Sequence, residues 1–261
     1  MADATGHIEP AVDGRWKMFM RVGQAAFEKG NYRGAEKMFR SALQEAEKLG
    51  SMDTRLSVTL VNLALTYCTQ GKHDLADPLY KRALSIDEII LGPESRDLAI
   101  DLNNMAAHYR RMGRHDEAER LYKHALSILE RACKPYDPDL ALVRNNLALL
   151  YCDLGQCNKA EPLYKAALEA RECALGSKHP QVAETLVALA GLYRMNNRYE
   201  EAEPLYQRAI SVLEVALGPD HPELATALQE YSELLHLTGR DEESRQLEQR
   251  ADAIWSKADR L

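Results

Sequence analysis

The chain has 261 residues, of which 46% are hydrophobic and 28% are charged, which excludes a disordered polymer and provides ample apolar side chains for a core. Its 33 Lys and Arg residues against 40 Asp and Glu residues give a net charge of −7, which argues against a nucleic-acid-binding protein and a generally membrane-adherent one. No run of 18 apolar residues occurs, so the sequence contains no candidate for a membrane-spanning helix.

The first segment, residues 1–14, is expected to be a flexible N-terminal tail. It carries Asp3, Glu9 and Asp13 and no apolar stretch, which does not fit the pattern of a secretory signal. The chain's five cysteines are an odd number without regular spacing, so they do not form the pattern of a disulfide framework. A reducing, cytoplasmic location is therefore predicted.

From about residue 16 onward, the sequence repeats itself with a period of 42 residues. Each copy has an alanine followed four positions later by a tyrosine. The alanines are Ala76, Ala118, Ala160 and Ala202, and the tyrosines are Tyr80, Tyr122, Tyr164 and Tyr206. A second set lies upstream in the same copies, with Ala64, Ala106, Ala148 and Ala190 followed by Tyr67, Tyr109, Tyr151 and Tyr193.

Within each copy, two apolar stripes have the three- and four-residue spacing of amphipathic helices. In the second copy they cover residues 60–67 and 75–86, and Gly71 lies between them, where a helix C-terminus favours a left-handed residue. Asn197 replaces this glycine in the copy that starts near residue 183. Prolines in the linkers indicate where the next copy begins. Each copy is therefore predicted to be two antiparallel helices.

These alanine, tyrosine and glycine positions resemble the tetratricopeptide repeat. The longer period, together with residues 102–106 and 217–222, is similar to the kinesin light chain subfamily of these repeats. The resemblance spans about residues 16–257. It implies an all-α, right-handed superhelical solenoid of about six helix-turn-helix repeats, with the first helices lining a concave groove.

The predicted repeat domain covers residues 15–261. We place its copies at residues 16–56, 57–98, 99–140, 141–182, 183–224 and 225–261. In the last copy Ser244 replaces the first alanine and Glu248 stands where tyrosine is expected. Polar residues at these positions are typical of a capping repeat, whose outer face has no neighbour, so the last copy is predicted to be the cap.

Residues of the first helices outside the packing stripe are expected to face the groove, and several of these are asparagines. Asn62, Asn104 and Asn146 occupy one position in three consecutive copies, and Asn103 and Asn145 extend the row. A carboxamide both donates and accepts hydrogen bonds, so such a row could hold the backbone of a bound peptide. The family resemblance implies this role for the asparagines at 62, 104 and 146. The alternative is that asparagine braces the neighbouring repeat.

Basic and apolar residues complete the predicted peptide-binding site. Arg110, Arg111 and Arg194 favour an acidic peptide, because guanidinium groups bind carboxylates, although they could instead pair with acidic residues of adjacent copies. The apolar positions are predicted to be sockets for ligand side chains, with burial under neighbouring helices as the alternative. They are Val58, Leu65 and Ile100.

No motif indicates an enzyme, a metal site or a cofactor. The sequence has no glycine-rich phosphate loop, no nucleophile elbow and no metalloprotease helix. Its cysteines and histidines do not show the paired spacing of zinc ligands. His73 and His115 share one repeat position beside the turn, which we interpret as a variable surface position.

The sequence therefore predicts a non-enzymatic scaffold or adaptor for protein–protein interaction. Its ligand would be an extended or short helical peptide segment, acidic and with an apolar anchor, bound in the groove. Neither nucleic acid nor membrane insertion is expected. Two alternatives remain open at this point: a structural repeat protein that assembles with copies of itself, and a regulatory domain that senses a peptide.

Overall fold

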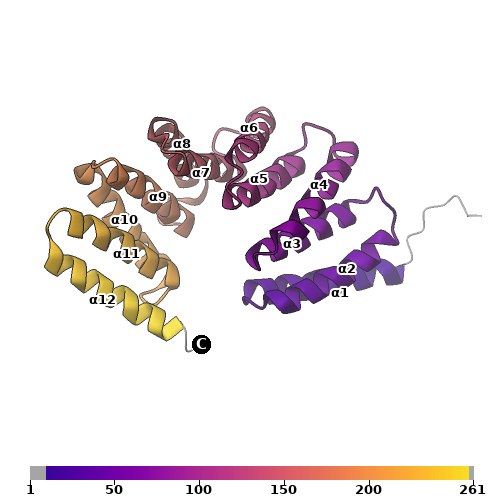
Figure 1. Cartoon of the computed structure of the whole chain (residues 1–261), viewed down its shortest axis with the longest axis horizontal. Coiled ribbons are helices and arrows are strands. Elements are labelled where there is room, and N and C mark those ends of the chain that lie inside the picture. Colours follow the sequence, from indigo (N-terminus) through magenta and orange to yellow (C-terminus); the bar gives the residue numbers. More distant parts are fainter. Residues whose placement is uncertain (1–9, 259–261) are drawn as a thin grey trace, which may run out of the picture. The chain divides into compact units, whose positions relative to one another are not determined.

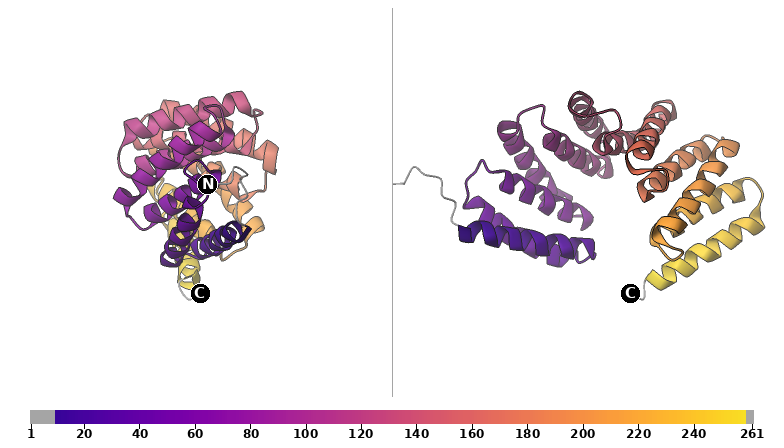
Figure 2. Two further views of the ribbon diagram at one scale, coloured as in Figure 1. Left: turned by 90° about the vertical axis from the view of Figure 1, so that its right-hand side faces the viewer. Right: turned by 180° about the vertical axis from the view of Figure 1, so that it is seen from behind.

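The computed structural model describes residues 10–258, which form twelve α-helices and no strand (Figure 1). The helices pair in chain order into six antiparallel hairpins. Figure 2 shows these hairpins from two further sides. None of the helices in the described part has the length and hydrophobicity that crossing a membrane requires.

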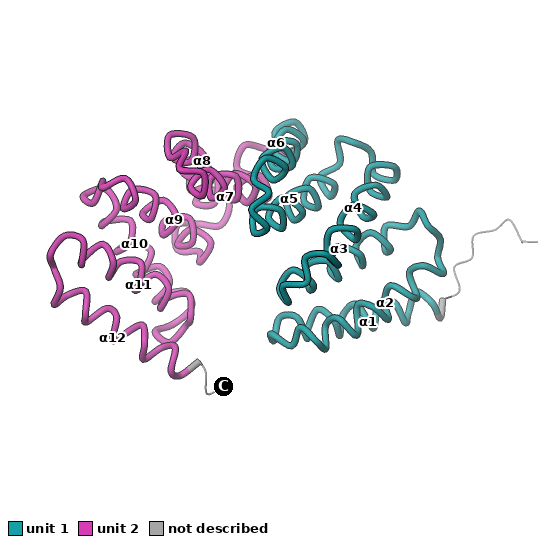
Figure 3. The backbone as a smooth tube through the Cα atoms, viewed as in Figure 1, with its two compact units in different colours: residues 1–132 teal, residues 133–261 magenta. Residues whose placement is uncertain are grey.

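The hairpins belong to two compact units, residues 1–132 and residues 133–261 (Figure 3). Unit 1 contains α1 (Pro10–Glu28), α2 (Tyr32–Glu47), α3 (Thr54–Thr69), α4 (His73–Ile90), α5 (Arg96–Arg111) and α6 (His115–Ala132). Unit 2 contains α7 (Pro138–Asp153), α8 (Cys157–Leu175), α9 (Pro180–Met195), α10 (Tyr199–Leu217), α11 (Pro222–Leu237) and α12 (Asp241–Ala258).

The first helix begins earlier than the sequence predicts. Because α1 starts at Pro10, residues 10–14 of the predicted tail are helical. Proline suits this position, since its fixed φ is that of a helix and its missing N–H would have no partner in the first turn. The remaining residues of the predicted tail, 1–9, lie outside the described residues.

The turns follow the predicted register. Gly71, Gly113 and Gly155 have φ of 72°, 73° and 67°, and Asn197, the residue that replaces glycine, has φ of 57°. At the helix starts, α7, α9 and α11 have proline in the first turn, preceded by a capping side chain. The caps, which accept a hydrogen bond from a backbone N–H two residues later, are Asp137, His179 and His221.

The repeated alanines and tyrosines form the core of the hairpins. The alanines at 76, 118, 160 and 202 are fully buried, and the tyrosines four residues later are at most 1% exposed. The small alanine side chain allows two helices to approach closely, and the tyrosine ring fills the adjoining space. Each hairpin then packs against the next hairpin of its unit.

Ion pairs between successive hairpins add a second periodic feature, which the sequence analysis missed. The residue after the turn glycine or asparagine is basic in most copies; we call these residues the turn cations. Each pairs with an acidic residue on the preceding second helix: Lys72 with Glu36 at 2.8 Å, Arg114 with Asp77 at 3.4 Å, Arg198 with Glu161 at 2.6 Å, and Arg240 with Glu203 at 2.6 Å. The first three also lie over a tyrosine ring of their own hairpin.

The last hairpin, α11–α12, differs from the others at the positions where the sequence predicts a cap. Ser244 is buried and its Oγ donates to the carbonyl oxygen of Ser232 at 2.9 Å, so this serine belongs to the interior of the hairpin. Glu248, which stands where the other copies have tyrosine, is exposed. Only the second of these two substitutions places a polar side chain toward solvent.

Candidate functional site

Unit 1 holds most of the predicted site residues, on the neighbouring first helices α3 and α5 (Figure 1). On α3 they are Val58, Asn62 and Leu65, and on α5 they are Ile100, Asn103, Asn104, Arg110 and Arg111. Val58 and Arg111 are exposed, Asn103 is buried, and the others are half-buried.

Two stripes of similar chemistry lie on these helices. Residues four and seven positions apart share one face of an α-helix, so Ile100, Asn104 and Arg111 line one face of α5. On α3, Asn62 and Leu65 lie four and seven positions after Val58, so these three residues also share one face. We call these two stripes together the α3–α5 surface. On each helix an apolar residue is followed four positions later by an asparagine: Val58 by Asn62 on α3, and Ile100 by Asn104 on α5.

The asparagines of the predicted row divide into two groups. Consecutive helical residues point about 100° apart, so one member of each Asn-Asn pair turns inward: Asn103 is 2% exposed and Asn145 is 5% exposed. Asn104 is half-buried and makes no hydrogen bond with any residue in the described range. Asn62 donates from Nδ2 to the carbonyl oxygen of Val58 at 2.8 Å, which leaves its Oδ1 to accept. Asn146, on α7, is half-buried.

The predicted arginines also differ. Arg194, on α9 of unit 2, forms ion pairs with Glu230 at 2.8 Å and Glu233 at 2.6 Å, both on α11, and its Nε lies 3.3 Å from Tyr206 Oη. Its charge is therefore neutralised by the neighbouring repeat. In unit 1, Arg111 is exposed and has no hydrogen bond or ion pair with any residue between 10 and 258. Its charge is available to a ligand.

The first helices of unit 2 form a pocket of a different character. A cavity of about 510 Å³ opens between α9, α10 and α11. Val187, Leu213 and Ala227 form apolar walls, and the carboxylates of Glu184 and Glu223 lie among the lining groups. Glu184 is paired with Arg171 at 2.8 Å, so Glu223 is the acidic group that contrasts most with Arg111 on the α3–α5 surface.

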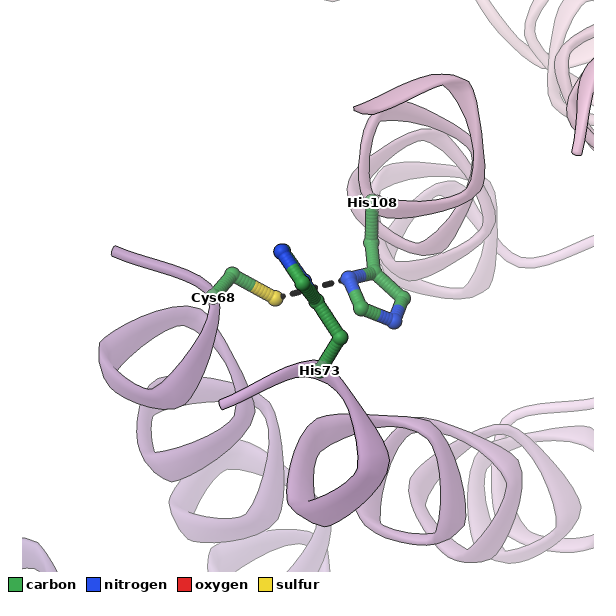
Figure 4. A group of neighbouring side chains, drawn as sticks. All are labelled: Cys68, His73 and His108. Carbon is green, nitrogen blue, oxygen red and sulfur yellow. Dashed lines mark hydrogen bonds between the residues drawn. The ribbon is translucent and has the colours of Figure 1, made fainter. Parts of the chain in front are cut away.

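Unit 1 also gathers three potential metal ligands that the sequence analysis did not connect. Cys68 at the end of α3, His73 at the start of α4 and His108 on α5 point toward one another (Figure 4). The three side chains come from three helices, and His108 is 40 residues beyond Cys68 in the sequence. Because Cys68 and His108 are so far apart in the sequence, the spacing of cysteines and histidines does not indicate this cluster.

The family to which the chain belongs follows from its repeats. The sequence profile of the tetratricopeptide repeat matches residues 17–89, 55–131, 97–172, 139–214 and 181–257, which overlap and together cover nearly the whole chain. The chain belongs to the tetratricopeptide repeat family. The predicted fold class, an all-α solenoid of tetratricopeptide-type hairpins, is thereby confirmed.

Solved structures with this tetratricopeptide fold include kinesin-light-chain-like proteins. BtubC (BKLC) from P. vanneervenii is 21% identical, with a TM-score of 0.70 over 96% of this chain and 93% of that one. A putative kinesin light chain of Podosopora anserina with nearly identical tetratricopeptide-like repeats is 23% identical, with a TM-score of 0.68 over 80% and 98%. The resemblance to the kinesin light chain subfamily is thus confirmed at the level of the fold.

A third tetratricopeptide-like structure is of a Rap protein in complex with competence and sporulation factor. It is 16% identical to this chain, with a TM-score of 0.67 over 98% of this chain and 77% of the other. At these identities the likeness establishes the fold alone. A comparison with curated protein sequences found no match.

Proposed function

We propose that the α3–α5 surface binds an acidic segment of a partner protein, either extended or in a short helix. The tetratricopeptide fold is consistent with a scaffold for protein–protein interaction, and one Rap protein of similar fold was solved in complex with a factor. The observation that carries the proposal is that Asn104 and Arg111 lie on the same face of α5. Both side chains lie at the surface without a hydrogen-bond partner within residues 10–258.

Each group on the surface has a distinct task in this proposal. The carboxamides of Asn104 and Asn62 bind backbone N–H and C=O groups of the segment, independently of its sequence. The guanidinium group of Arg111 binds a carboxylate through two parallel hydrogen bonds. Val58 and Ile100 contact an apolar side chain of the segment and remove it from water. Because ordering a flexible segment opposes binding, we expect roughly micromolar affinity, about −8 kcal/mol.

A peptide-binding measurement tests this assignment. Fluorescently labelled peptides of one length and constant apolar content, with a graded number of Asp and Glu residues, are titrated with the full chain, and their anisotropy is recorded. We expect affinity to rise with the number of acidic residues. The double variant Asn104→Ala and Arg111→Ala should lose at least about tenfold in affinity, which corresponds to about 1.4 kcal/mol.

Matched controls are available on the second helices. Arg120→Ala on α6 and Asn158→Ala on α8 remove the same two side chains from exposed positions away from the α3–α5 surface, and they should bind as the unaltered chain does. If the acidic peptides bind the double variant as tightly as they bind the unaltered chain, this surface is not the binding site. If none of the acidic peptides binds the unaltered chain, the proposal is wrong.

Self-assembly predicts a different result for the same surface. If the occupant were a second copy of the chain, the molecular mass measured by light scattering would increase with protein concentration. The Asn104 and Arg111 variant would then stay monomeric. A chain that is monomeric at all concentrations favours a separate protein partner.

A further inference from the structure

We propose that Cys68, His73 and His108 form a binding site for a zinc ion that links α3, α4 and α5 of unit 1 (Figure 4). Each residue contributes one ligand atom: the Cys68 sulfur and one ring nitrogen from each histidine. None of the three ligands belongs to the proposed peptide-binding residues, and the site needs no peptide to form.

The spacing of the three ligand atoms fits a single small ion. All three lie within 4.8 Å of one another, and Cys68 Sγ is 3.0 Å from His108 Nδ1. With Zn–S and Zn–N bonds of about 2.3 and 2.1 Å, ligand atoms of a tetrahedral site are about 3.5 Å apart. Small side-chain rotations therefore suffice to seat the ion. Three protein ligands leave a fourth position for water.

His108 departs from the repeat pattern in a way that packing does not explain. Three other copies place a buried leucine at the equivalent position: Leu150, Leu192 and Leu234. His108 is 1% exposed, and its Nε2 is buried without a hydrogen-bond partner in the described range, as is Nδ1 of His73. Burying an imidazole in place of leucine costs free energy unless the ring gains a specific interaction. Metal coordination through Nδ1, the ring nitrogen that faces Cys68, would provide that interaction, and Nε2 would keep its place without a partner among the described residues.

The donor set favours zinc over harder cations. A thiolate and two imidazoles, without a carboxylate, suit Zn²⁺ and not Mg²⁺ or Ca²⁺. Zinc is coordinated by neutral imidazole and by thiolate, so binding of the ion would release the proton of the Cys68 thiol.

Tyr80 packs against the cluster. Tyr80 Oη lies 3.9 Å from Cys68 Sγ, and its ring centroid is 5.5 Å from that of His108. The charged groups that act on Cys68 and His108 are Asp77, Arg111 and Arg114. Because the three ligands come from successive hairpins, the bound ion would join the second copy to the third.

Unit 2 contains an incomplete version of the same cluster. Two periods after Cys68 and His73 stand Cys152 and Cys157, and Leu192 occupies the position equivalent to His108. Cys152 Sγ keeps the 3.9 Å contact with a tyrosine hydroxyl, that of Tyr164, which Cys68 makes with Tyr80. The missing histidine makes unit 2 an internal control.

Calorimetric titration of the full, chelator-treated chain with zinc chloride tests the site. We expect one high-affinity zinc ion per chain and release of a proton on binding. Both Cys68→Ser and His108→Leu should weaken binding at least about 100-fold, which corresponds to about 2.7 kcal/mol. His108→Leu introduces the residue that equivalent copies bury, so this variant should fold normally. Cys173→Ser removes an exposed cysteine elsewhere and should leave the affinity unchanged.

Cobalt provides a spectroscopic check on the ligands. Co²⁺ bound in place of zinc should show a sulfur-to-metal absorption band that disappears in Cys68→Ser. Leu192→His completes the cluster of unit 2 and should add a second cobalt site with two thiolate ligands. Zinc that binds the folded His108→Leu variant as tightly as the unaltered chain would overturn the assignment. The absence of any high-affinity zinc in the unaltered chain would do so as well.

Discussion

The two units bury opposite charges at one repeat position. Asp87 on α4 of unit 1 and Arg171 on α8 of unit 2 are two periods apart in the sequence and are 1% and 2% exposed. Asp87 accepts a hydrogen bond from Ser57 Oγ at 2.5 Å and lies against Asp101. Arg171 donates from Nη1 to the carbonyl oxygen of Gln181 and to Thr185 Oγ1, both at 2.7 Å.

Other copies fill this position with Leu129 and Leu213, so the helix packing does not require a charged group there. The comparison shows that the space between hairpins accepts an acid, a base or an apolar side chain, with most polar atoms of the charged groups in hydrogen bonds. The comparison also predicts that replacing the buried charged residue changes the free energy of unfolding differently in the two units. The acid in unit 1 is stabilised by a proton held between two carboxyl groups, whereas the arginine in unit 2 is stabilised by permanent acceptors.

The largest effect is expected for Arg171. Arg171→Ala leaves a cavity and removes the donor from Gln181 and Thr185, so the free energy of unfolding should fall by about 2–4 kcal/mol in urea titrations. Arg171→Leu introduces the residue of equivalent copies and should change it by less than about 1 kcal/mol. Equal losses in both variants would show that the charge itself holds the two hairpins together.

Overpacking should affect both units alike. Ala118 in unit 1 and Ala160 in unit 2 are fully buried at the same repeat position. A leucine at either site has no space between the helices, so Ala118→Leu and Ala160→Leu should each lower the free energy of unfolding by about 1–3 kcal/mol. Thermal melts with Ser85→Leu, at an exposed position of α4, serve as the control. A melt unchanged by either alanine variant would contradict the repeat register.

The neighbouring carboxyl groups of Asp87 and Asp101 should make the free energy of unfolding depend on pH. Burial, and the hydrogen bond that protonated Asp101 donates to Asp87, raise the pKa of Asp101. Because the folded chain holds this proton more tightly than the unfolded chain, the free energy of unfolding should fall as pH rises above about 4. Asp101→Asn removes this loss and should stabilise the chain by about 1–2 kcal/mol at alkaline pH, with little effect near pH 4.

Unfolding in urea across this pH range measures the difference. Asp116→Asn, at an exposed position of α6, is the control and should leave the pH dependence unchanged. Asp101→Asn with the same pH slope as the unaltered chain would show that the pair does not share a proton.

The smallest effect is expected for the turn cations. Arg198 and Lys165 donate hydrogen bonds to Glu161 and lower the pKa of this carboxyl to about 2. Because the pair is partly exposed, Arg198→Gln should reduce the free energy of unfolding only slightly near neutral pH. The loss should shrink as pH falls below about 4, where Glu161 of the unfolded chain becomes protonated. Arg114→Gln in unit 1, whose contact with Asp77 is longer, should cost less still.

The sequence predicted the hairpins because their determinants are local and repeat every 42 residues. Gly71 and Asn197 adopt positive φ as their places between two helical stripes imply. The tail boundary differed because Pro10 initiates a helix without belonging to the repeat pattern. Helix starts flanking Pro138 and Pro222 were predictable from the chemistry of proline.

The candidate site was harder to predict because the orientation of single side chains decides it. Periodicity placed Asn103 and Asn104 in one row, but the rotation between neighbouring helical residues buries the first. Arg194 is neutralised by acidic residues of α11, which no local pattern connects to it. The departure of His108 from a leucine position was visible in the aligned copies, yet its proximity to Cys68 required the structure.

The turn cations have a consequence for how such a chain grows. Each ion pair joins an acid in one copy to a base in the next, for example Glu203 to Arg240, so the copies that hold Lys72 with Asp77 and Arg198 with Glu203 carry one half of two successive pairs. Duplication of one of these two copies in the gene would therefore reproduce both halves, and the inserted module would meet complementary charges on either side. Lengthening by whole modules requires no compensating substitution, whereas insertion of half a copy would separate every donor from its acceptor at that junction.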